Sequence, residues 1–236
     1  MQGISVPHAA VAAGTPPVAG CGLECIYVVG GSDGNYRDCR TVERYDPKKD
    51  MWEVVEAMSS KGSKVMCAVL DNRLHAIAQT VDVYDPATRT WDRIAHGRGH
   101  LPLHAFRRFH VCVTLGDQIY ALGGDILGGG WTGRDVREGT VVQRYDERTG
   151  RWEDCANMYR SLRTRAYAVL GDHIYAIGGV SEGCDYPKTN YLKTVQRYNP
   201  TRDCWEPVQD MPVGRWVHAA AVMGGCVYAL GGRDNE

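Results

Sequence analysis

A tyrosine followed seven residues later by a tryptophan occurs four times in this sequence of 236 residues. The pairs are Tyr45 and Trp52, Tyr84 and Trp91, Tyr145 and Trp152, and Tyr198 and Trp205. In three of them the tyrosine is followed by Asp-Pro or Asn-Pro. These dipeptides are typical of the start of a type I turn, because proline presets φ. The spacing therefore predicts four similar hairpins, each with its two aromatic side chains close together.

Each of these hairpins follows two apolar segments separated by a short break. In residues 161–211, for example, the apolar segments are 165–170 and 173–179, with Gly171 and Asp172 between them. Segments rich in Val, Ile, Tyr and Trp and bounded by Gly, Pro, Asn and Asp are typical of β-strands. Four in succession predict an antiparallel meander, whose strands we call a, b, c and d. Because the unit recurs, we expect a repeat array of such blades.

The repeat divides the chain into blades at about residues 1–58, 59–97, 98–158, 159–211 and 212–236. The fifth contains only strands a and b. Strand b ends in Gly-Gly in every blade except the second, where Ala78 and Gln79 replace the glycines. Paired glycines suit a backbone with positive φ or a close approach of another backbone. Because a lone hairpin is not stable in water, we expect the aromatic pairs to pack against neighbouring blades.

Strand b ending in Gly-Gly, then tyrosine, then tryptophan seven residues on is the pattern of the Kelch repeat, and the chain resembles the Kelch β-propellers. The Tyr-Asp-Pro turns and the methionines after strand d (Met58, Met158, Met211) look most like the Kelch-like family, in which BTB and BACK domains precede the propeller. The resemblance implies an all-β fold, a Kelch β-propeller with four full blades plus strands a and b of a fifth. Because propellers close with roughly 4–8 blades, we expect this chain alone to be a partial propeller whose first and last blades expose apolar surface.

The resemblance also implies a function. It indicates a protein-protein interaction module, the substrate-recognition propeller of an adaptor for a cullin-3 RING E3 ubiquitin ligase. Cullin-3 would be reached only through a BTB domain, which is absent from this sequence. Two alternatives stay open, an actin-binding or cytoskeletal Kelch scaffold and a small-molecule enzyme of the Kelch superfamily. An upstream BTB sequence would favour the adaptor, and a metal signal in the purified protein would favour the enzyme.

Composition is that of an ordinary soluble globular chain. The formal net charge is −1, so no excess of charge points to nucleic acid or a membrane surface. The apolar runs have the length of strands, too short to span a bilayer. Nine cysteines are scattered along the chain, and we expect Cys67, Cys112 and Cys226 to pack in the core. This usage favours a reducing compartment, so we expect a cytoplasmic protein, with a nuclear or cytoskeletal location as the alternative.

No catalytic constellation is recognisable. His96, His100 and His104 are spaced by four, as metal ligands on a helix would be, but glycines and a proline between them argue against a helix. The strand pattern brings together no Ser/His/Asp or Cys/His set, and no glycine-rich loop precedes a helix. We therefore expect no enzyme activity, no catalytic residue, no metal and no cofactor.

The predicted binding face is the one that carries the b–c and d–a connections. The a–b turns of blades two to five and all c–d turns are short and uniform, whereas the b–c loops are long in blades one, three and four and nearly absent in blade two. Long, variable loops on a rigid scaffold commonly carry binding residues. Aligned on strand b, Arg108, Arg163 and Trp216 are equivalent, as are Arg107 and Arg215. We expect these residues to lie around one rim.

Arginine, tyrosine and tryptophan, which are enriched at binding hot spots, are frequent in these connections. The candidate partner-binding residues are Tyr36, Arg37, Arg107, Arg108, Trp131, Arg134, Arg163, Tyr186, Tyr191 and Arg215. Convergent guanidinium groups bind carboxylates or phosphates in a bidentate manner. We therefore expect the partner to be a protein or peptide that carries acidic or phosphorylated residues.

Overall fold

The computed structural model describes residues 10–13, 25–31, 35, 37–59, 65–78, 80–94, 107–108, 110–126, 140–159, 162–163, 166–181 and 191–234. The regular elements in these ranges are all β-strands. None of the described segments is a helix long and apolar enough to cross a membrane. The chain divides into two compact units, Met1–Pro102 and Leu103–Glu236, and each is described by itself.

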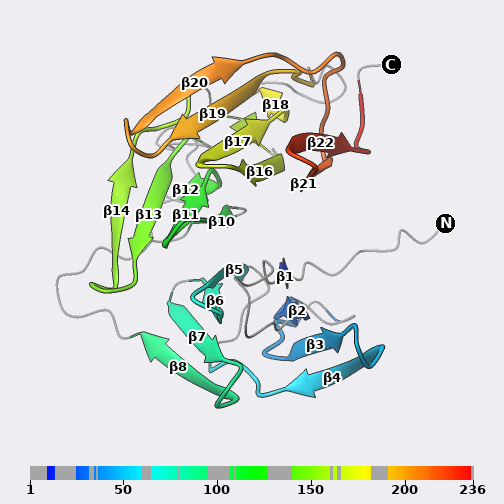
Figure 1. Ribbon diagram of the computed structural model, residues 1–236, viewed down its shortest axis with the longest axis vertical. Coiled ribbons are helices and arrows are strands. Elements are labelled where there is room, and N and C mark those ends of the chain that lie inside the picture. Colours follow the sequence, from blue (N-terminus) through cyan, green and yellow to red (C-terminus); the bar gives the residue numbers. More distant parts are fainter. Residues whose placement is uncertain are drawn as a thin grey trace. The chain divides into compact units, whose positions relative to one another are not determined.

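The first unit contains two four-stranded antiparallel sheets, each a simple meander (Figure 1). Blade one consists of β1 (Ala10–Ala13), β2 (Ile26–Val29), β3 (Val42–Asp46) and β4 (Met51–Val55). Blade two consists of β5 (Met66–Leu70), β6 (Arg73–Ile77), β7 (Val81–Asp85) and β8 (Thr90–Ile94).

The second unit contains two more four-stranded meanders and a two-stranded hairpin (Figure 1). Blade three consists of β10 (Val111–Leu115), β11 (Gln118–Leu122), β13 (Val142–Asp146) and β14 (Arg151–Cys155). Blade four consists of β16 (Ala166–Leu170), β17 (His173–Ile177), β19 (Val195–Asn199) and β20 (Cys204–Val208). Blade five consists of β21 (Ala219–Met223) and β22 (Cys226–Leu230). The predicted fold, four full blades plus strands a and b of a fifth, is confirmed.

The tyrosine and tryptophan of each c–d hairpin lie directly opposite one another in the strand register. Their ring centroids are 5.2, 5.1, 5.1 and 5.3 Å apart in blades one to four. The turns are fixed by their first acidic residue. Asp46, Asp85 and Asp146 accept a hydrogen bond at Oδ1 from the backbone N–H two residues on, at 3.0, 2.7 and 2.9 Å. The predicted pairing of the two aromatics is confirmed.

The strand-d tryptophan also joins its blade to the preceding one. In the first unit, Trp91 donates its indole N–H to the carbonyl oxygen of Glu56 at 2.7 Å. In the second unit, Trp205 donates to the carbonyl oxygen of Ala156 at 2.9 Å. Glu56 and Ala156 occupy the same place in the repeat, four residues after the tryptophan of their own blade. The expectation that the aromatic pairs pack against neighbouring blades is thereby confirmed at these two junctions.

A second aromatic contact repeats at the same two junctions. Tyr27 on β2 meets Tyr84 on β7 edge to face, with 6.1 Å between centroids, and Tyr120 on β11 meets Tyr198 on β19 at 5.7 Å. All four rings are buried. Each junction thus contains a strand-b tyrosine, a strand-c tyrosine and a strand-d tryptophan, which belong to the apolar core of each unit or pack against it.

The glycine pair after strand b meets both physical conditions expected of it. All eight glycines of the four Gly-Gly pairs have positive φ. A Cβ on Gly178 would lie 2.8 Å from the carbonyl oxygen of Arg215, and one on Gly232 would lie 2.7 Å from that of Trp216. In blade two, Ala78 instead donates its N–H to Thr80 at 3.0 Å, and the chain enters β7 at once. The glycines are therefore absent from the blade whose b–c connection is a tight turn.

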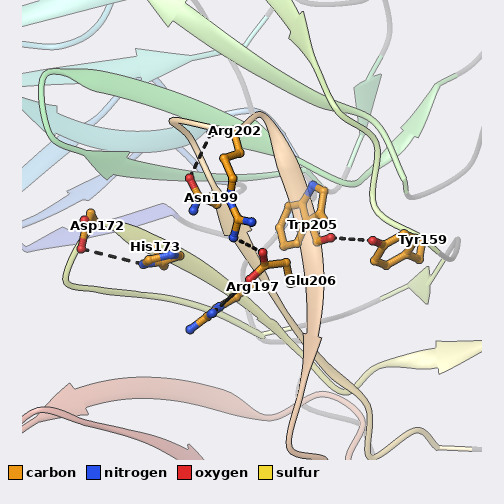
Figure 2. A network of polar contacts seen from close by, with 8 residues as sticks. All are labelled: Tyr159, Asp172, His173, Arg197, Asn199, Arg202, Trp205 and Glu206. Atoms are coloured by element: carbon orange, nitrogen blue, oxygen red, sulfur yellow. Dashed lines mark hydrogen bonds and ion pairs between the residues drawn. The ribbon is translucent and has the colours of Figure 1, made fainter.

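A cross-strand row of polar side chains lies on the strands of blades one, three and four. Its strand-c and strand-d members are Arg44 with Glu53, Arg144 with Glu153 and Arg197 with Glu206, each an ion pair. Figure 2 shows the last pair, in which Glu206 lies between Arg197 and Arg202 and bonds to both. The hydrogen bond from Arg197 holds the pKa of Glu206 below its usual range.

The two outermost blades in sequence expose apolar side chains, as predicted. The side chain of Trp52 on β4 is 52% exposed and that of Leu230 on β22 is 53% exposed. The prediction that Cys226 packs in a core is wrong, because it lies on the exposed hairpin of blade five. Cys67 and Cys112 are half-buried. The seven cysteines within the described ranges are all free thiols.

Candidate functional site

The candidate site is the end of the second unit where the b–c and d–a connections lie. Here the residues just before strand a pair with those just after the glycine pair, beyond the main sheet. Arg108 in β9 (Arg107–Arg108) pairs with Asp125 in β12 (Asp125–Ile126). Arg163 in β15 (Leu162–Arg163) pairs with Val180 in β18 (Val180–Ser181).

Blade five repeats this short ribbon with a tryptophan. Trp216 pairs with Arg233, the N–H of each donating to the carbonyl oxygen of the other at 2.9 and 2.8 Å. Arg108, Arg163 and Trp216 therefore occupy equivalent backbone positions in three successive blades, as the alignment predicts. The backbone at each of these positions is therefore paired within a short ribbon.

An aromatic and cationic cluster surrounds Trp216. Its ring stacks on that of Tyr191, with 5.5 Å between centroids and 16° between planes. The guanidinium carbon of Arg233 lies 5.7 Å from the centroid of the Trp216 ring, a cation–π distance. The indole nitrogen of Trp216 is buried and has no hydrogen-bond partner among the described residues. One contiguous surface is thus formed by Tyr191, Trp216 and Arg233. We call these three residues, together with Arg215 and His218, the Trp216 cluster.

Arg215 fastens this cluster to blade four as well as blade five. Its backbone N–H donates to Leu192 at 3.1 Å, and its carbonyl oxygen accepts from Gly179 at 2.9 Å. Its side chain donates from Nη1 to the carbonyl oxygen of Gly231 at 2.7 Å. The guanidinium group is therefore held in place with donors remaining, which suits it to bind an anionic group.

His218 lies close to the glycine pairs of blades four and five, where a Cβ on Gly178 or Gly232 would meet it at 2.9 or 2.8 Å. Both of its ring nitrogens are buried and lack a hydrogen-bond partner within the described part of the chain. Burial, and secondarily the charge of Arg215, lower the pKa of His218 below its usual value, so the ring is neutral at pH 7. A neutral imidazole offers one donor and one acceptor. Together with the Trp216 indole, the cluster therefore holds unused hydrogen-bonding groups next to two fixed cations.

The structure brings together only some of the predicted binding residues. Tyr191 and Arg215 lie in the Trp216 cluster, and the backbones of Arg107, Arg108 and Arg163 lie in the rim ribbons. Arg37 is exposed and belongs to the first unit. The remaining four, which lie outside the described residues, are Tyr36, Trp131, Arg134 and Tyr186.

Two members of the cluster were missed by sequence reasoning. Arg233 follows the Gly-Gly of blade five directly, so it aligns with Asp125 and Val180, and that alignment could have placed it on the rim. His218 lies just before β21 and gave no signal, because a histidine next to an apolar strand is read as core.

Nothing in the described residues resembles a metal centre, since no three His, Cys, Asp or Glu side chains there are arranged to hold an ion. The histidines His96, His100 and His104 lie outside the described residues. A hollow of about 580 Å³ exists at the opposite end of the second unit, among the turns of blades three and four. Asp117, Arg144 and Asp172 line it, a set that suggests no particular cofactor.

Comparisons with known proteins agree with this architecture. The model of the Kelch motif matches residues 14–59 and 163–212. Rat Kelch-like protein 36 is 26% identical over 226 residues, which cover 89% of this chain and 34% of that protein. Kelch-like protein terF of Aspergillus terreus is 33% identical over 128 residues, 53% of this chain and 27% of that protein. Human Kelch-like protein 15 is 25% identical and is covered to 35% of its length.

The chain thus spans about a third of the length of the curated relatives it matches. Among solved structures, that of YjhT superposes with a TM-score of 0.70 over 97% of this chain and 77% of that one, at 13% sequence identity. At this identity the likeness concerns the fold alone. It agrees with the succession of four-stranded meanders described above.

Proposed function

Because two stretches of this chain match the model of the Kelch motif and its sheets are four-stranded meanders, we propose that it is a Kelch-repeat protein-interaction module whose binding surface is the rim of b–c and d–a connections. The observation that carries the proposal is the recurrence of one backbone position across three blades. This position is occupied by Arg108, Arg163 and Trp216 in blades three, four and five. At Trp216 it belongs to the Trp216 cluster, which includes Tyr191 and Arg215. Arginine and aromatic side chains of this kind dominate binding hot spots.

The chemistry of the rim favours a partner segment with acidic or phosphorylated residues. Arg215 and Arg233 supply fixed positive charge, and Tyr191 and Trp216 supply flat aromatic surface. Each hydrogen bond to a charged group contributes about 1.5–3 kcal/mol, so two or three such bonds with aromatic contact reach micromolar affinity. Carboxylate and phosphate groups can both accept such hydrogen bonds from arginine. Binding assays with matched acidic and phosphorylated peptides distinguish the two.

In the cell, we propose that the propeller presents this partner to a cullin-3 RING E3 ubiquitin ligase, in the cytoplasm. The support is the similarity to proteins named Kelch-like over most of this chain. Recruitment of cullin-3 would need a BTB domain elsewhere in the protein. Copurification of cullin-3 with the full-length protein, but not with residues 1–236, is the expected result. Its absence from both would contradict the adaptor role and leave the binding proposal intact.

The binding proposal is tested by fluorescence anisotropy with four matched peptide pools: acidic, phosphorylated, neutral and basic. We expect the acidic or the phosphorylated pool to bind, and to bind more weakly as salt rises, because the Debye length falls from about 8 Å at physiological ionic strength to about 3 Å at 1 M. Arg163→Ala combined with Arg233→Ala should weaken binding further without lowering the melting temperature.

The matched control is Arg148→Ala. Arg148 is an exposed arginine of the same unit, but it lies in the c–d turn of blade three, at the other end of the strands. It should leave binding unchanged. Equal losses in the control and the rim variant would show a non-specific charge effect, and binding that survives the rim changes and high salt would overturn the assignment.

A further inference from the structure

The hollow of about 580 Å³ at the turn end of the second unit lies at the junction of blades three and four. Its lining includes Asp117 and Asp172 from the a–b turns of the two blades, and Pro200 and Thr201 from the c–d turn of blade four. Arg144 on β13 lines it as well. The volume lies within the range of about 300–1,000 Å³ that is typical of small-molecule sites. Both blades at this junction are four-stranded, so the hollow is framed within the described residues.

Arg144 is more accessible than its equivalent in the first unit. Arg144 and Arg44 each form an ion pair with a glutamate of strand d, but the side chain of Arg144 is 39% exposed and that of Arg44 is 10% exposed. The pair of Arg144 with Glu153 joins Nη2 to Oε2 at 2.6 Å. A guanidinium group has five N–H donors. Arg144 therefore retains donors that a ligand in the hollow could use.

The c–d turn of the following blade differs between the two junctions. In the first unit, Arg89 of this turn lies 3.5 Å from Glu53, the carboxylate that pairs with the strand-c arginine. Its equivalent in blade four is Asp203, five residues after the tyrosine in each case. Asp203 accepts hydrogen bonds from the hydroxyl of Tyr198 at 2.6 Å and from the N–H of Ala156 at 2.8 Å. The turn of blade four therefore adds no second cation to the arginine–glutamate pair of blade three.

Two carboxylates from equivalent turns line the same hollow. Asp117 and Asp172 each follow a glycine with positive φ in the a–b turn of their blade. A Cβ on either glycine, Gly116 or Gly171, would meet nothing within 4 Å, so the space beside both turns is open. The side chain of Asp172 is 94% exposed, and its Oδ1 lies 3.8 Å from Nδ1 of His173 (Figure 2). Among the described residues, the lining thus combines one cation with two carboxylates.

We propose that this hollow binds a small zwitterion, a molecule of amino-acid or dipeptide size that carries one ammonium and one carboxylate group. A simple anion would be attracted by Arg144 but repelled by Asp117 and Asp172, and a simple cation would meet the opposite conflict. A zwitterion matches both signs: its carboxylate accepts charge-assisted hydrogen bonds from Arg144, and its ammonium donates to the two aspartates. The site is at the other end of the strands from the rim and does not depend on the rim proposal.

The remaining lining indicates the side chain of such a ligand. Leu115 and Pro200 contribute apolar atoms beside the charged groups. Ligand sites of this size commonly combine apolar walls with a few convergent polar groups that fix orientation. An aliphatic side chain next to the two charged groups therefore suits the hollow, and leucine is the simplest probe.

The test is isothermal titration calorimetry of the protein with four probes: leucine, leucyl-leucine, N-acetyl-leucine and leucinamide. N-acetyl-leucine lacks the ammonium group and leucinamide lacks the carboxylate, so each removes one half of the proposed match. We expect leucine or leucyl-leucine to bind saturably, and both singly charged probes to bind at least tenfold more weakly. Tighter binding of leucyl-leucine would indicate a peptide as the source of the zwitterion, and tighter binding of leucine a free amino acid.

Two variants place the binding in this hollow. Thr201→Trp should abolish it, because Thr201 is an exposed lining residue and the indole would fill the space. The matched control is Ala87→Trp, an exposed residue at the same place of the c–d turn in blade two, which should leave binding unchanged. Asp172→Asn should weaken leucine but change N-acetyl-leucine little, since only leucine carries the ammonium group.

The proposal would be overturned if none of the four probes bound, or if a singly charged probe bound as tightly as the zwitterions. Binding of leucine that is unchanged in Thr201→Trp would overturn it as well, since the ligand would then lie elsewhere. The comparison of probes leaves the protein unaltered, so a variant that fails to fold cannot decide the outcome.

Discussion

Trp205 of blade four donates its indole N–H to the backbone carbonyl oxygen of Ala156 in blade three, at 2.9 Å. The ring is 2% exposed and lies 5.3 Å from that of Tyr198. Both contacts recur in the first unit, where Trp91 bonds to Glu56. The tryptophan therefore joins successive blades and takes no part in the binding surface.

Replacement of Trp205 by alanine should lower the free energy of unfolding by about 3–5 kcal/mol, because a large buried ring leaves a cavity and an unpaired carbonyl. Trp52→Ala is the matched control, since Trp52 holds the same place in the repeat with a ring that is 52% exposed. It should cost about 1 kcal/mol or less. Urea denaturation followed by circular dichroism measures both, and equal costs would contradict the structural assignment.

A second prediction concerns the glycine pairs. Gly178→Ala should destabilise the protein more than Gly171→Ala, although both glycines have φ of 59°. At Gly171 the new Cβ meets nothing within 4 Å, so only the left-handed backbone costs energy, about 1–2 kcal/mol. At Gly178 the Cβ would also lie 2.8 Å from the carbonyl oxygen of Arg215. The difference in melting temperature between the two variants measures the cost of the contact between the new Cβ and the Arg215 carbonyl oxygen. Identical melting temperatures would show that the backbone moves to relieve this contact at no cost.

Much of the fold is predictable from the sequence because its signals are local. The spacing of Tyr45 to Trp52 and its repeats locates every c–d hairpin, and the glycine pairs locate the ends of strand b. The turn geometry is less visible. The residue two before each tryptophan has positive φ, but only in blade three is it a glycine, the others being Asp50, Arg89 and Asp203. At these positions the repeated hairpin imposes a positive φ that the residue type does not predict.

The candidate site is less predictable, since it depends on contacts between segments far apart in sequence. Alignment on strand b gives the equivalence of Arg108, Arg163 and Trp216. It does not give the stacking of Tyr191 on Trp216, because Tyr191 follows a long loop and is placed there by its bridge to Val180 and by the backbone hydrogen bonds of Leu192. The prediction for Cys226 was wrong for a related reason, because an apolar strand is buried only where another element packs on it.

A third prediction concerns acid stability. The folded pKa of Glu206 lies below its unfolded value, through its hydrogen bond with Arg197, so the stability it contributes is present above about pH 4.5 and is lost as pH falls through the folded pKa. Glu206→Gln should therefore make the loss of stability below pH 5 shallower, and high salt should have the same effect. Glu43→Gln, an exposed carboxylate on β3, is the control. Identical acid-denaturation curves for wild type and Glu206→Gln would contradict the role of this network.

The last prediction concerns the titration of His218, which should report on charges placed at the Trp216 cluster. Its pKa is lowered by burial and by the charge of Arg215, so the folded protein binds the proton less readily than the unfolded chain. The stability that follows is complete above the unfolded pKa of about 6.5 and is lost as pH falls from there through the folded pKa.

Proton NMR of the His218 ring should show this lowered pKa directly. Arg215→Ala should raise it, because one of its two causes is removed, whereas Arg148→Ala should leave it unchanged. An acidic peptide bound at the Trp216 cluster should raise it too, since a negative charge beside the ring stabilises the imidazolium form. A peptide that binds tightly without moving this titration would bind elsewhere, and the cluster would then be a structural feature of the junction between blades four and five.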